Sequence, residues 1–275
     1  MPFFVSCSVQ EDTGGDLTSK PSIIKFAYTP QEITDLISAS NSAVAHRGAW
    51  RKNNLPENSL ESLKEAVRLK CKGSEFDIVF TADDSLVVNH DSQYNNFDIQ
   101  TSRYTDLISL KLVNGEKIPT LREFIIAGMQ NNTTTKLFCE LKNYSLSSSR
   151  KYSYVLAVLS CVEKLKAHQF MVYTCFDYDM LKHIRSIDAY ANIQYLGGDV
   201  SPLQLKSDGI SAADYKLSVF YKDHPEWIQI AKENGVFLNV WTIYADGYMD
   251  WCLKNKFDYL TTDEPELQIS KQTKK

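Results

Sequence analysis

Two pairs of charged residues, each with a spacing of two, are the first features of the sequence that could carry chemistry. Glu75 and Asp77 lie within one apolar run, and Glu140 and Lys142 repeat the spacing further along the chain. Successive side chains of a strand point to opposite faces, so each pair would share a face. Three converging carboxylates repel one another unless a cation joins them, and their oxygens favour Ca2+ or Mg2+. We therefore predict that Glu75, Asp77 and Glu140 bind one divalent cation, although a solvated polar strand face is the alternative for Glu75 and Asp77 taken alone.

Two histidines add acid–base capacity to this set of acids. His46 closes one apolar run and His90 follows another. Histidine can donate or accept a proton at neutral pH, and phosphodiester cleavage needs one base for the attacking hydroxyl and one acid for the leaving oxygen. Arg47 and Lys142 are candidate cations for the charge on the phosphoryl oxygens. An isolated histidine is more often structural, so the prediction depends on the whole set.

A turn-like segment, Thr81–Ser85, separates two strand-like runs and fixes where His90 would lie. If Asp83 and Asp84 form a two-residue hairpin turn, counting back in register places Asp77 opposite His90. A slip of one residue would turn His90 away.

The elements that must position these residues alternate along the chain between strand-like and helical patterns. The expected strands are Ala43–His46, Gly73–Phe80, Lys136–Leu141, Phe170–Phe176, Asn192–Leu196, Gly209–Ala213, Val236–Ile243 and Tyr259–Thr262. The expected helices are a short one from Thr29, then Asn58–Cys71, Thr120–Met129, Ser149–Leu165, Asp177–Ile187, a turn near Leu203, His224–Asn234 and Gly247–Lys254.

Eight strands with helical connections in 275 residues favour a closed (β/α)8 barrel of the TIM type, which typically has about 250 residues. We expect one barrel domain over residues 22–275, with a short β-hairpin and a small insertion after the second strand. The predicted site residues lie at strand ends, where such barrels carry out catalysis. No strand is followed by G-x-G-x-x-G and no P-loop is present, so a dinucleotide or nucleoside triphosphate fold lacks its fingerprint.

Composition excludes several other classes of protein. The net charge is −4 with a pI near 5.8, and no basic stripe suggests nucleic-acid binding. No apolar run approaches the roughly 20 residues of a transmembrane helix. Five of the six cysteines are expected to be small buried apolar residues, because none is spaced as C-x-x-C.

Cys7 is the sixth cysteine and has a different context. It follows Phe3-Phe4-Val5-Ser6 and precedes polar and acidic residues, as at the end of a bacterial lipoprotein signal. Residues 1–21 are expected to form a flexible segment that tethers a lipid anchor at Cys7, with a periplasmic or membrane-anchored location. The basic region and most of the apolar region of such a signal are missing, so the alternative is coincidence and a cytoplasmic protein.

The chain resembles the glycerophosphodiester phosphodiesterase family over about residues 43 to 267. The motifs that carry the resemblance, in the family's order, are Ala45-His46-Arg47-Gly48, Pro56-Glu57-Asn58-Ser59, Glu75-Phe76-Asp77, Thr81-x-Asp83, Leu86-Val87-Val88-Asn89-His90-Asp91, Ile118-Pro119-Thr120-Leu121, Glu140-Leu141-Lys142, Val240-Trp241-Thr242 and Thr261-Thr262-Asp263-x-Pro265.

The resemblance implies a barrel that hydrolyses glycerophosphodiesters to glycerol 3-phosphate and an alcohol, in glycerol and lipid metabolism. It implies a role for each matched residue: His46 and His90 as acid and base, Glu75, Asp77 and Glu140 as metal ligands, Arg47 and Lys142 as phosphate-binding cations, Glu57 as their support and Trp241 as a wall of the substrate pocket. The segment Asp91–Lys117 departs from the family pattern in the region that caps the glycerol moiety. Two alternatives stay open: a related barrel acting on phosphatidylinositol or sphingomyelin, and an inactive binding protein.

Overall fold

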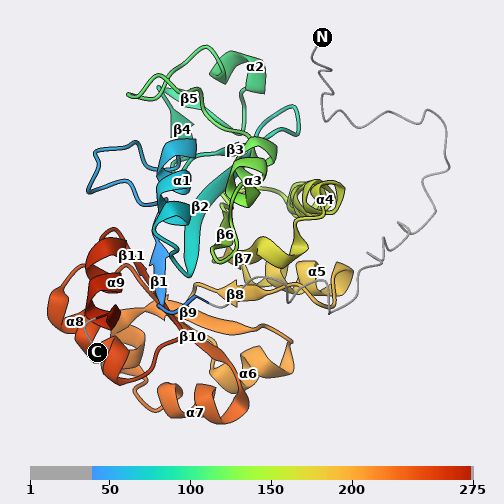
Figure 1. The fold of residues 1–275 in the computed structure, drawn as a ribbon. Helices are drawn as coiled ribbons and strands as arrows, with labels where there is room; N and C mark the ends of the chain where they lie inside the picture. Colours follow the sequence, from blue (N-terminus) through green and yellow to red (C-terminus); the bar gives the residue numbers. More distant parts are fainter. Residues whose placement is uncertain (1–38, 274–275) are drawn as a thin grey trace.

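Eight parallel strands close into a barrel in the computed structural model, which describes residues 39–273 (Figure 1). Each strand pairs with its neighbours, and β1 pairs with both β2 and β11, which completes the ring. The barrel strands are β1 (Ala43–Ala45), β2 (Gly73–Phe80), β6 (Lys136–Leu141), β7 (Met171–Cys175), β8 (Ile193–Tyr195), β9 (Ala212–Lys216), β10 (Phe237–Trp241) and β11 (Tyr259–Thr262). The predicted (β/α)8 fold is confirmed. The expected helix at Thr29 and the segment with Cys7 lie outside the described residues.

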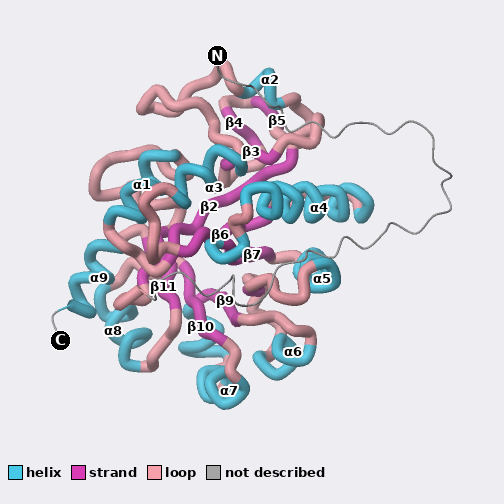
Figure 2. The backbone as a smooth tube through the Cα atoms, turned by 45° about the vertical axis from the view of Figure 1, so that its right-hand side comes forward, coloured by secondary structure: helices cyan, strands magenta, loops and turns pink. Residues whose placement is uncertain are grey.

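Helices surround the barrel and cover the outer faces of its strands (Figure 2). They are α1 (Leu60–Arg68), α3 (Leu121–Met129), α4 (Ser148–Leu165), α5 (Tyr178–Ile187), α6 (Pro202–Ser207), α7 (Trp227–Asn234), α8 (Asp246–Lys254) and α9 (Pro265–Thr273), the last of which was not predicted. Capping boxes at Ser59 and Thr120 begin α1 and α3 by satisfying free backbone N–H groups. Among the residues that the structure describes, no helix combines the length and the hydropathy that crossing a bilayer requires.

The main core lies between the strands and the helices, and a smaller one fills the barrel itself. Val44, Phe138, Val172 and Tyr259 pack together inside the barrel and are almost fully buried. The five cysteines of the described region are buried, as predicted. Because the barrel interior is packed, it can support a site at its mouth but is not a channel.

The predicted strand Gly209–Ala213 is displaced by three residues in the structure. Gly209 has a φ of +71° and lies just after α6, where the Ile210 N–H bonds back to the carbonyl of Leu205. Glycine therefore ends a helix at this point instead of beginning a strand. The strand that follows, β9, brings Asp214 into the barrel wall.

The hairpin register predicted between Asp77 and His90 is wrong by one residue. The antiparallel strand β3 (Leu86–Val88) pairs with β2 so that Ile78 lies opposite Val88. The turn contains three residues instead of two, because Asp84 adopts a φ of +61° as such turns require.

A small insertion follows β3, as expected from the sequence. It contains the two-stranded β4 (Gln93–Tyr94) and β5 (Phe97–Asp98) and the single turn α2 (Tyr104–Leu107). Tyr94, Ile99 and Leu107 pack against Val79 and Val87 of the hairpin. The atypical segment after His90 is thus a compact cap with its own apolar cluster, placed beside the barrel mouth.

Candidate active site

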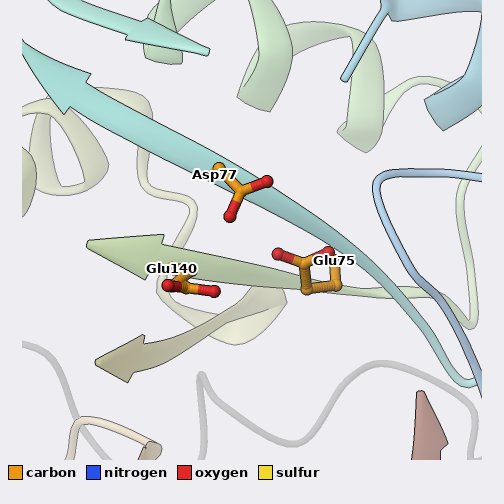
Figure 3. A group of neighbouring side chains, drawn as sticks. All are labelled: Glu75, Asp77 and Glu140. Atoms are coloured by element: carbon orange, nitrogen blue, oxygen red, sulfur yellow. The ribbon is translucent and has the colours of Figure 1, made fainter. Parts of the chain in front are cut away.

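Three carboxylates converge at the mouth of the barrel (Figure 3). Glu75 and Asp77 extend from the same face of β2, and Glu140 extends from β6, where it is the register partner of Asp77. One oxygen from each carboxylate lies within 4.8 Å of one oxygen from each of the other two. Strand alternation and parallel pairing thus bring the three predicted acids together.

Lys142 contacts both Asp77 and Glu140, and Asn58 contacts Asp77. The Lys142 ammonium lies 3.0 Å from Asp77 Oδ1 and 2.7 Å from Glu140 Oε1. Asn58 donates from Nδ2 to Asp77 Oδ2 at 2.9 Å and accepts the Asp77 backbone N–H at 3.1 Å. These contacts fix the Asp77 side chain. Asn58 was part of a recognised motif, but no role had been predicted for it.

Burial and mutual repulsion control the charge of the acids. Burial, together with the negative charges of Asp77 and Glu140, raises the pKa of Glu75 well above its ordinary value. Burial and the negative charge of Asp77 raise the pKa of Glu140 to about 7. Burial would also raise the pKa of Asp77, but the attraction of Lys142 and His90 outweighs it and lowers that pKa. The site therefore holds more acid than its own cations neutralise.

Arg47 connects the acids to the first βα loop. Its backbone N–H donates to Glu75 Oε2 at 2.8 Å, and its guanidinium donates to Glu57 at 2.8 Å. The guanidinium Nε also lies 3.7 Å from Asp77 Oδ2. Arg47 has a φ of +56°, a conformation that turns the chain sharply at the end of β1. Glu57 therefore contacts Arg47, another of the residues that the sequence analysis named.

His46 and Asp263 form a pair at the ends of β1 and β11. The His46 Nδ1 lies 2.7 Å from Asp263 Oδ1, and both side chains are largely buried. A carboxylate at this distance holds the proton on Nδ1 and leaves Nε2 available to a substrate. The sequence placed Asp263 at a strand end without giving it a role.

His90 reaches the same cavity in spite of the changed register. β3 ends at Val88, so strand alternation no longer determines where His90 points. The Tyr144 hydroxyl donates to the His90 carbonyl, and the Asn89 N–H donates to the Asp77 carbonyl at 3.0 Å. The two histidines, Glu140 and Lys142 line one cavity of about 240 Å³.

Two further residues line this cavity, namely Trp241, which the sequence analysis had named, and Asp214, which it had not. Trp241 lies in its wall and meets Phe176 edge-on at 5.5 Å between ring centroids. Asp214 of β9 also lines it, almost fully buried. A second cavity, of about 590 Å³, shares His90, Glu140, Lys142 and Phe176 with the first. Two spaces therefore meet at the predicted histidine and lysine.

Comparisons with known proteins agree with this geometry. The model of the glycerophosphoryl diester phosphodiesterase family matches residues 46–267. A glycerophosphodiester phosphodiesterase of Caldanaerobacter subterraneus is 26% identical over 250 residues, which are 82% of this chain and 96% of that protein. A crystal structure of a glycerophosphodiester phosphodiesterase from Parabacteroides distasonis superimposes with a TM-score of 0.82 at 31% identity, over 86% of this chain and 99% of that one. An Oleispira antarctica phosphodiesterase in complex with the product sn-glycerol-3-phosphate shares the fold, with a TM-score of 0.71 at 20% identity, over 89% of this chain and 99% of that one.

Proposed function

The chain belongs to the glycerophosphoryl diester phosphodiesterase family and is a phosphoric diester hydrolase, and we propose that it cleaves glycerophosphodiesters to glycerol 3-phosphate and an alcohol with one divalent cation. The observation that carries this proposal is a cluster of three carboxylates, two of which line one cavity together with both histidines. The five groups come from the end of β1, from β2, from β6 and from the segment after β3, and the fold brings these parts of the chain together. That arrangement matches what phosphodiester hydrolysis needs, namely acids for a metal, an acid–base pair and cations for phosphate.

Glu75, Asp77 and Glu140 fit a hard divalent cation such as Ca2+ or Mg2+. Glu75 Oε1 is buried and has no hydrogen-bond partner among the described residues, so one ligand atom is unsatisfied. Carboxylate oxygens are the ligands that such ions prefer. When bound, the cation would neutralise the acids and withdraw charge from the phosphoryl oxygens.

The side chains of the chain itself would orient the phosphate and move the protons. Arg47 and Lys142 supply positive charge at the acids, where the phosphoryl oxygens of a diester would lie. His46, with Nδ1 held by Asp263, presents Nε2 for proton transfer. His90, which lines the same cavity, supplies the second transfer. One histidine serves as base toward the attacking hydroxyl and the other as acid toward the leaving oxygen.

Trp241 and Glu57 support this chemistry without taking part in it. The Trp241 indole N–H donates to the backbone carbonyl of Asp214 at 2.9 Å, which fixes the ring as a wall beside the reacting groups. Glu57 holds the Arg47 guanidinium in position for phosphate. The geometry of both residues is therefore consistent with substrate positioning.

The test is hydrolysis of a panel of substrates by protein loaded with Ca2+ or Mg2+. The panel contains glycerophosphocholine, glycerophosphoethanolamine, phosphatidylinositol, sphingomyelin and bis(p-nitrophenyl) phosphate. We expect turnover of the glycerophosphodiesters that chelator abolishes and added metal restores. Faster cleavage of intact phospholipids would favour the related barrel phosphodiesterases that act on phosphatidylinositol or sphingomyelin. These lipids are in the panel because the aromatic side chains of Phe176 and Tyr244 are exposed beside the cavity. No turnover of any compound would favour an inactive binding protein.

A further inference from the structure

One buried carboxyl group in the cavity has no part in the chemistry described above. Asp214 is 3% exposed, and its Oδ1 has no hydrogen-bond partner among the residues that the structure describes. It lines the same cavity as His46, Lys142 and Trp241. A buried carboxyl oxygen without a partner is costly, and such a group in an active-site cavity suggests a partner that arrives with the substrate.

The register of the strands sets the direction of the Asp214 side chain. Asp214 pairs with Asn239 of β10, and paired residues of parallel strands point to the same face. Asn239 faces the barrel interior, because it donates to Gln194 Oε1 at 3.1 Å and accepts from Thr261 at 3.2 Å. Asp214 therefore points inward as well. Asn239 donates to Gln194, accepts from Thr261 and also faces the Asp214 carboxyl. Asp214 Oδ1 nevertheless has no hydrogen-bond partner among the described residues, and Gln194 Nε2 is a second buried atom of which this is true.

The charges around Asp214 indicate which kind of group it would receive. A phosphate would lie instead beside Arg47 and Lys142, which supply the positive charge that Asp214 lacks. An ammonium group is disfavoured, because the Lys216 ammonium already lies over the Trp241 ring at 5.3 Å and Lys142 adds a second positive charge nearby. A neutral hydroxyl meets neither objection. A carboxyl group can bond a hydroxyl in either of its protonation states.

We propose that Asp214 determines specificity by bonding a free hydroxyl of the glycerol moiety, an assignment that builds on the function proposed above. The cavity of about 240 Å³ that Asp214 lines would then hold glycerol against Trp241, and the larger cavity beyond His90 and Lys142 would hold the alcohol that leaves. The phosphate would lie where the two cavities meet. Recognition of this kind selects strongly against a substrate that lacks the hydroxyl, because it leaves the carboxyl unpaired.

The experiment combines a change in the residue with a matching change in the substrate. Glycerophosphocholine is compared with n-propyl phosphocholine, which differs by lacking the two glycerol hydroxyls, in wild type, Asp214→Leu and Asp214→Ala. The measured quantity is the ratio of kcat/KM for the two substrates. We expect this ratio to fall by about tenfold or more in both variants, since a hydrogen bond is lost only where the hydroxyl is present. Asp214→Asn, which keeps hydrogen-bonding groups, should retain most of the ratio.

Controls separate this assignment from folding and from the proposed function. Asp188 is also almost fully buried but lies at the end of α5, at the opposite end of the barrel, so Asp188→Asn should leave the ratio at its wild-type value. Thermal unfolding of Asp214→Leu should occur at or above the wild-type temperature, because an unpaired polar group is removed. A ratio that stays within about twofold of wild type overturns the role of Asp214 alone. A wild-type enzyme that cleaves neither substrate, with metal supplied, overturns the proposed function and this assignment with it.

Discussion

Metal binding at the three acids should release protons, and Glu140 makes the effect measurable near neutral pH. Burial and the charge of Asp77 raise the pKa of Glu140 to about 7, so this carboxyl is half protonated there without a cation. A divalent cation binds the carboxylate and not the acid. Lowering the pH from 8 to 6 should therefore weaken divalent cation binding.

The size of the change follows from the fraction of Glu140 that is ionised. With a pKa of about 7, roughly nine-tenths is ionised at pH 8 and roughly one-tenth at pH 6, so apparent affinity should fall about tenfold. The pKa of Glu75 is also raised, so any proton on Glu75 adds to this factor. Isothermal titration calorimetry in two buffers of different ionisation enthalpy counts the protons released. Glu140→Gln is the matched control and should lose both the affinity and the Glu140 part of its pH dependence.

The same proton affects the stability of the metal-free protein. The folded chain binds a proton on Glu140 more tightly than the unfolded chain, in which glutamate has its ordinary pKa of 4.5. Stability is therefore lost as the pH rises from about 4.5 to 7, by up to about 3 kcal/mol in total. Added cation should raise the Tm more at pH 8 than at pH 6. Affinity and Tm gain that are both independent of pH between 6 and 8 would refute the reasoning.

Three further predictions concern the neighbouring groups. His46→Ala and His90→Ala should each reduce turnover by about 10²-fold or more with an unchanged circular dichroism spectrum, and near-normal activity in either variant would remove that histidine from the mechanism. Asp263→Asn should lower kcat/KM by about 10-fold or more, because the 2.7 Å contact that fixes the His46 ring loses its charge; an unchanged rate would mean that the contact does not orient His46. Glu75→Gln should weaken metal binding, and an unaltered metal dependence of the rate would contradict its assignment as a ligand.

Local patterns were sufficient to predict the barrel and most of its strands. The predicted bounds of the strands at Gly73, Lys136 and Tyr259 coincide with β2, β6 and β11. These runs alternate or stay apolar over their whole length, and turn residues bound them, so the signal is contained within a few neighbouring positions. The three acids followed from the same logic, because alternation along β2 and parallel pairing with β6 are sufficient to bring them together.

Turn geometry explains the two local errors. A turn of two residues and one of three have nearly the same composition, and the backbone conformation of Asp84 decides between them. A glycine such as Gly209 can end a helix or precede a strand. Here the backbone hydrogen bonds of Gly209 and Ile210 to carbonyls of α6 show that it ends the helix. The register error did not remove His90 from the site, because β3 stops before the histidine. The position of the His90 side chain therefore depends on where β3 ends and not on how β3 pairs with β2.

The functional residues that sequence reasoning missed have in common that their partners are remote or absent. Asp263 contacts His46 across 217 positions of sequence, and Asn58 contacts Asp77 across 19. Neither contact has a periodic signature. The closed barrel creates the first by pairing the last strand with the first, and the loop between β1 and α1 brings Asn58 to Asp77 of β2. Asp214 is even harder to predict from the sequence, because the evidence for its role is an oxygen atom in the cavity that has no hydrogen-bond partner. A sequence shows which residues can form a bond, whereas only a packed structure shows which of them has been left without one. The substrate pairing experiment on Asp214 is therefore the sharpest test of what the fold adds to the sequence.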